Sequence, residues 1–160
     1  MTDIFGLPTI DYSRDTERLR GLCGRKYQKA INRLIKRRGA RCNQAGVFAD
    51  IEDVELARLG RCAATASLSV TPAGHWFATL DWRTATEGGG AAPSVAQPTA
   101  YPSRDIALTA MRMRAYEKFQ RIAERTHDSC LTDAMREEAA RMAVALEEAF
   151  TARRQPDLFG

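Results

Sequence analysis

Two runs of alternating apolar and polar residues limit what this chain can fold into. Residues 64–71 alternate Ala, Leu and Val with Thr and Ser, and residues 76–82 continue the pattern from Trp76 to Trp82. A period of two is typical of strands, and the Pro-Ala-Gly sequence at 72–74 favours a turn between them. The sequence therefore predicts a β-hairpin with both tryptophans on its core face.

Helical spacing dominates the C-terminal third. Ser103 can cap a helix that runs to about Thr126, and a second helix runs from Leu131 or Thr132 to about Arg153. Two long helices with a short link favour an antiparallel helical hairpin. Apolar residues recur three or four positions apart at Leu108, Met111, Ala115, Phe119 and Ile122, and again at Leu131, Met135, Ala139, Met142, Leu146 and Phe150.

A long basic helix is predicted from Ser13 to about Arg38, with Gly21 and Gly24 weakening its middle. Between Arg14 and Arg41 the chain has eleven basic and two acidic residues, a net charge of +9, while the remainder carries −5. Such a face can neutralise the phosphates of DNA or RNA, or meet an acidic protein, although a solvated face is the simpler alternative. The candidate binding residues are Arg18, Arg25, Lys26, Lys29, Arg33, Lys36, Arg37, Arg38 and Arg41.

The intervening segments complete an α+β prediction. Asp50–Leu59 favours a short helix that Gly60 would end. Residues 87–103 are rich in Gly, Pro and small residues, which predicts an exposed, flexible loop. We expect a single domain over residues 1–160, with an exposed tail at 154–160.

An alternative interpretation places a DNA-binding helix-turn-helix in the same region. Residues 54–60 resemble its first helix and turn, and residues 63–70 would then be the recognition helix. However, residues 63–70 alternate with a period of two and begin without long polar side chains that could reach base edges. The hairpin is therefore the favoured prediction.

The composition excludes several classes of protein. No apolar run is long enough to span a bilayer, and the first residues do not form a secretory signal, so we expect a cytoplasmic protein. Cys23, Cys42, Cys62 and Cys130 are widely spaced, without a CxxC pair or a Cys/His cluster. This spacing predicts no metal and no cofactor, and favours small buried thiols.

The chain ends with a short motif, Gln155-Pro156-Asp157-Leu158-Phe159, followed by Gly160. It resembles the peptide with which many bacterial proteins dock on the replication sliding clamp: Gln155, Asp157, Leu158 and Phe159 match, and Pro156 departs from the usual residue. An extended peptide can insert such an apolar pair into a groove while the glutamine amide bonds at its edge. The resemblance implies a sliding clamp as partner; the alternative is a local hydrophobic cap.

These features predict a non-enzymatic accessory protein of phage, plasmid or other mobile-element origin. It would dock on the clamp through its tail and contact nucleic acid through its basic helix. His75 and His127 lack a local nucleophile or carboxylate arrangement, so we expect no catalytic residues. The alternatives are an anti-defence type of inhibitor that blocks a nucleic-acid-processing complex, and a small enzyme. The helical hairpin is a candidate homodimer surface.

Overall fold

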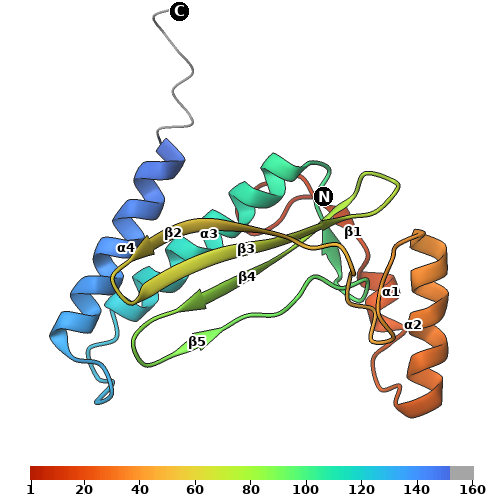
Figure 1. The fold of residues 1–160 in the computed structure, drawn as a ribbon, viewed down its shortest axis with the longest axis horizontal. Coiled ribbons are helices and arrows are strands. Elements are labelled where there is room, and N and C mark those ends of the chain that lie inside the picture. The colour runs from red at the N-terminus through yellow and green to blue at the C-terminus, as the bar shows by residue number, and fades with distance from the viewer. Residues whose placement is uncertain (152–160) are drawn as a thin grey trace, which may run out of the picture.

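The computed structural model describes residues 1–151 and confirms a mixed fold of helices and antiparallel sheets (Figure 1). The elements are β1 (Ile10–Asp11), α1 (Ser13–Glu17), α2 (Gly24–Arg38), β2 (Glu52–Leu59), β3 (Cys62–Val70), β4 (Trp76–Arg83), β5 (Gly88–Gly89), β6 (Thr99–Ala100), α3 (Arg104–Ala123) and α4 (Asp133–Thr151). Strands β2, β3, β4 and β5 form one sheet in that order, and β1 pairs with β6. Figure 1 shows α3 behind the sheet, with α1 and α2 at the opposite end of the molecule from α4.

The predicted β-hairpin is confirmed. Strands β3 and β4 pair antiparallel from Ala63 opposite Arg83 to Val70 opposite Trp76. Alternate residues of both strands face the helices, and Trp76 and Trp82 are partly buried against the larger core. This core lies between the sheet and helices α3 and α4, because each element has one apolar face to bury.

Helix α3 begins where the sequence predicts. The hydroxyl of Ser103 accepts a hydrogen bond from the backbone N–H of Ile106, at 3.3 Å, which satisfies one of the free donors of the first turn. The predicted apolar stripe of α3 is fully buried, including Phe119 at 0% exposure. In the described part of the chain, no helix has the length and apolar character needed to cross a membrane.

The short helix predicted at Asp50–Leu59 is wrong, because this segment is strand β2. A β-bulge between Glu55 and Ala57 shifts the alternation by one position. Val54 and Leu56 before the shift and Ala57 and Leu59 after it then all face the core, so their spacing imitates a helix. The helix-turn-helix interpretation is wrong for the same reason, since both of its helices are strands.

The single long helix predicted from Ser13 to Arg38 is also wrong. Helix α1 ends at Glu17, and α2 begins only at Gly24. Gly21 (φ 76°) and Gly24 (φ 52°) adopt left-handed conformations that other residues rarely accept. The chain therefore turns between the two helices, which brings Asp15 of α1 beside the C-terminal end of α2.

The segment predicted as an exposed loop, residues 87–103, is exposed only in its first half. Val95, Ala100 and Tyr101 are buried, and Val95 and Ala100 belong to a second, smaller core that packs α2 onto the end of the sheet. Backbone hydrogen bonds tie Val95 to Gly46 and Tyr101 to Trp76. The flexibility of this segment stays a prediction.

The sequence suggested that all four cysteines are buried, but the structure buries only one of them fully. Cys23 and Cys130 are exposed, Cys42 is half-buried and Cys62 is buried. Burial raises the pKa of the Cys62 thiol to about 11, so this side chain is neutral near pH 7 and packs as an apolar group.

Candidate nucleic-acid interface

Helix α2 carries the candidate site on the face it turns away from the core. Ile31 and Leu34 are buried in the smaller core, which fixes the orientation of the helix. Gly39, at φ 63°, ends the helix in a left-handed conformation. Because the apolar residues occupy one stripe, the Lys and Arg side chains between them point to solvent, except for Arg38 at the end of the helix.

Most of the predicted basic residues do form one exposed surface. Within residues 1–151, the side chains of six of them are exposed and make neither an ion pair nor a hydrogen bond: Arg18, which precedes α2, and five residues of α2 itself. Uncompensated cations on one helix face produce a local positive potential that attracts a polyanion. We call this surface the α2 basic face; it consists of Arg25, Lys26, Lys29, Arg33 and Lys36.

A shallow groove of about 490 Å³ runs along the α2 basic face. Its lining alternates cations with Gln28 and Asn32. The Gln28 amide donates to the Asn32 side chain, at 3.0 Å, and to the backbone carbonyl of Gln44, at 2.6 Å. The Gln28 amide nitrogen and the Asn32 amide oxygen are thus engaged with the protein, and four of the six groove-lining residues are cations, so the groove offers mainly charge.

A second hollow, of about 400 Å³, lies between α1 and α2. Its floor is apolar and its rim is basic, apart from the Asp15 carboxylate. Lys29 and Arg33 line both this cleft and the groove, so the two hollows form one continuous cationic surface. The floor residues are Leu19, Leu22, Ala30 and Leu34, and the rim cations are Arg18, Lys26, Lys29, Arg33 and Arg37.

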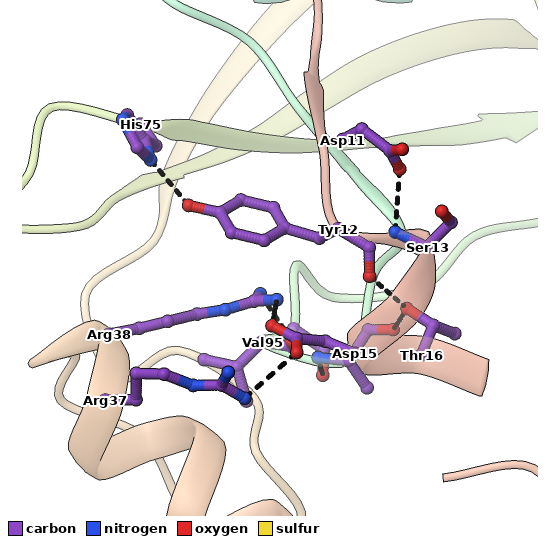
Figure 2. Close-up of polar contacts among 11 residues, drawn as sticks. Asp11, Tyr12, Ser13, Asp15, Thr16, Arg37, Arg38, His75 and Val95 are labelled. Atoms are coloured by element: carbon purple, nitrogen blue, oxygen red, sulfur yellow. Dashed lines mark hydrogen bonds and ion pairs between the residues drawn. The ribbon is translucent and has the colours of Figure 1, made fainter. Parts of the chain in front are cut away.

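Arg38 was predicted to bind a partner, but the structure buries it. Its side chain is only 4% exposed and lies under the Tyr12 ring, with 3.9 Å between the guanidinium carbon and the ring centroid (Figure 2). Arg38 donates to the backbone carbonyl of Val95, at 2.5 Å, and to Asp15, at 3.4 Å. Burial lowers the pKa of Arg38, while its hydrogen bond with Asp15 raises it. Arg38 therefore holds α1, α2 and the 93–97 segment together.

Sequence reasoning missed the aromatic residues around Arg38. The Tyr12 hydroxyl contacts the Nδ1 atom of His75 (Figure 2), with 2.6 Å between the two atoms, and the Tyr12 ring stacks on Phe77. These residues come from three separate segments, so spacing along the chain could not have indicated their contact. The cluster attaches the helix that carries the α2 basic face to the end of the sheet.

The remaining predicted cations have mixed environments. Arg37 forms an ion pair with Asp15, at 3.0 Å, while remaining 54% exposed. Arg41 lies beyond the helix and pairs with Asp50, at 3.3 Å, with both side chains largely exposed. Exposed pairs of this kind contribute little to stability, so Arg37 and Arg41 stay available to a partner.

The predicted clamp-binding residues Gln155, Asp157, Leu158 and Phe159 lie outside the described residues. His75 lies in the β3–β4 loop and His127 in the α3–α4 loop. Within residues 1–151, no cluster of three or more His, Cys, Asp or Glu side chains could hold a metal ion. Comparisons of the chain with protein-family models, curated proteins and solved structures found no match.

Proposed function

We propose that this protein is a non-enzymatic, cytoplasmic DNA-binding accessory protein that contacts the phosphate backbone through the α2 basic face. The observation that supports this most is the set of five exposed cations without an acidic partner in the described residues. Arg25 and Lys36 are eleven residues apart, which corresponds to about 16 Å along a helix. Over that length of duplex axis each strand carries about five phosphates, as many as the α2 basic face has cations.

The proposed contact is independent of base sequence. Lysine and arginine side chains that meet phosphates position a protein on DNA but do not distinguish bases. Gln28 and Asn32, the polar side chains among the cations, already hydrogen-bond within the protein. We therefore expect similar affinities for duplexes of different sequence.

The tail adds a second proposed contact. Its resemblance to a clamp-docking peptide is the support for a sliding clamp as partner, and an origin in a phage or other mobile element stays a prediction. When one of two linked sites is bound, the other is held close to its own partner at a high effective concentration. Neither site therefore needs high affinity alone. In this proposal α3 and α4 act as the antiparallel helical hairpin that braces the sheet, since they share the larger core.

Neutralising two central cations tests the DNA contact. We expect the double variant Lys29→Gln, Arg33→Gln to bind a duplex at least roughly tenfold more weakly at moderate salt, because two phosphate contacts are lost. The matched control is Arg83→Gln, Arg141→Gln, which removes the same charge from exposed residues of β4 and α4 that make no ion pair within residues 1–151. Fluorescence anisotropy with a labelled duplex measures the DNA affinity of both variants. Equal weakening by both would mean that DNA binding depends only on the net charge of the protein.

Removing the tail tests the clamp contact separately. A chain ending at Arg154 should lose binding to a bacterial sliding clamp while its DNA affinity stays unchanged. Phe159→Ala should have the same effect, because the aromatic ring is the largest group that the peptide can insert. Surface plasmon resonance on immobilised clamp measures the binding of each chain. Undiminished binding by the shortened chain would show that the tail does not dock on the clamp.

The cleft between α1 and α2 favours a second candidate function, an inhibitor that binds an acidic protein surface. An apolar floor with a cationic rim suits an acidic peptide that has apolar residues on one side. DNA binding does not use the floor, whereas a protein partner would. Leu22→Ser therefore distinguishes the two, since it should weaken only the binding of a protein.

A further inference from the structure

Within residues 1–151, no strand pairs with the outer edge of β2. β2 is the terminal strand of the four-stranded sheet, and Figure 1 shows it along the sheet's margin. We propose that this edge pairs antiparallel with β2 of a second copy of the chain, so that two four-stranded sheets become one continuous sheet. An unpaired edge presents backbone N–H and C=O groups that readily pair with another strand.

The register of the sheet identifies which β2 residues point outward. Backbone groups alternate between the two sides of an antiparallel strand. Trp76 exchanges two backbone hydrogen bonds with Tyr101 on the outer side of β4, so Phe77 must bond toward β3. The same alternation holds along β3 and β2. The backbone N–H and C=O groups of Glu52, Val54, Ala57 and Leu59 therefore bond toward β3. Those of Asp53, Glu55 and Arg58 face outward, at the free edge of the sheet.

The bulge gives β2 a self-complementary edge. It places the Glu55 and Arg58 side chains on the same face, where both are about half exposed and 2.7 Å apart at their closest charged atoms. An antiparallel copy with its two-fold axis between Leu56 and Ala57 sets Glu55 opposite Arg58 of the other chain, and Arg58 opposite Glu55. Both residues have outward backbone groups, so each pair also exchanges backbone hydrogen bonds.

The neighbouring positions agree with this register. On the core face, Val54 comes opposite Leu59 of the second copy, so an apolar residue meets an apolar residue. Asp53 comes opposite Gly60, which has no side chain and therefore creates no like-charge contact. Registers that set Glu55 or Arg58 opposite itself would instead oppose like charges, which destabilises a strand pair.

Charge reversal at the two positions provides the test. Sedimentation velocity of the full chain at micromolar concentrations should give twice the monomer mass. Glu55→Arg alone sets Arg opposite Arg, and Arg58→Glu alone sets Glu opposite Glu, so each variant should dimerise about 100-fold more weakly. A mixture of the two variants restores both opposite-charge pairs and should form a heterodimer.

The mixture shows whether a single variant fails to dimerise because its interface is disrupted or because it is misfolded. Misfolded chains could not form the heterodimer. Circular dichroism of each variant before mixing checks that both unfold cooperatively. Asp53→Asn is the matched control, since Asp53 faces Gly60 in this register and its change should leave the dimer intact. A monomeric parent chain, single variants that still dimerise, or a mixture that stays monomeric would each overturn the proposal.

Discussion

Replacing Arg38 with alanine is expected to lower the free energy of unfolding by about 3 kcal/mol, the usual scale for breaking a buried charged pair. The variant leaves the backbone carbonyl of Val95 without its donor and removes the cation from beneath the Tyr12 ring. It also takes one of two cationic partners from Asp15, which is 14% exposed. Because Arg38 connects α1, α2 and the 93–97 segment, we expect the loss to concentrate at this end of the molecule.

Urea denaturation with linear extrapolation measures this change. Arg37→Ala is the matched control, because Arg37 binds the same carboxylate but is 54% exposed. An exposed pair contributes at most about 1 kcal/mol. Equal destabilisation by the two variants would show that the buried position of Arg38 has no special role.

Replacing Gly46 with alanine is also expected to cost about 3 kcal/mol, from two separate effects. Gly46 has φ 83°, and a left-handed conformation costs about 1–2 kcal/mol for an alanine. The added Cβ would lie 2.9 Å from a methyl group of Val95 and 3.2 Å from one of Ile31, both fully buried. Overpacking of such a site costs about 1–3 kcal/mol.

Gly74→Ala separates the two effects. Gly74 has a similar φ of 80°, but a Cβ there meets nothing within 4 Å. This variant should therefore lose only the conformational part, about 1 kcal/mol. Thermal unfolding of both variants beside the parent chain gives the comparison, and equal losses would contradict the tight packing of Gly46 against Val95 and Ile31.

The sequence predicted best those elements whose signals are local. The cap at Ser103 and the apolar stripe of α3 are complete within one segment, and the β3–β4 hairpin has both its strands and its turn within residues 62–83. Such elements need no distant residue to decide their conformation. The α+β class followed from them.

The predictions from sequence failed where contacts between distant segments determine the local conformation. The bulge between Glu55 and Ala57 is a feature of the pairing of β2 with β3, and in the sequence it produces a helix-like spacing. Likewise, composition predicted an exposed segment at 87–103, although Val95 is completely buried there. Its burial depends on contacts with Gly46 and α2, which are distant in the sequence.

The candidate site was predicted in outline but not residue by residue. The residues of the α2 basic face are exposed, as their charge density suggested, and their binding role stays a prediction. Charge density did not distinguish Arg38, which is buried, from Lys36, which is exposed, because both belong to the same basic run. The distinction depends on Tyr12 and Asp15, which reach Arg38 only after the chain turns at Gly21.

The salt dependence of DNA binding by the full chain tests whether the α2 basic face contacts phosphates. If the α2 basic face contacts about five phosphates, the logarithm of the association constant should fall linearly with the logarithm of salt concentration, with a slope of about −4.5. The Lys29→Gln, Arg33→Gln variant should reduce that slope by about two. Absence of binding at low salt, or binding that does not change with salt, would contradict a phosphate-contacting function for this face.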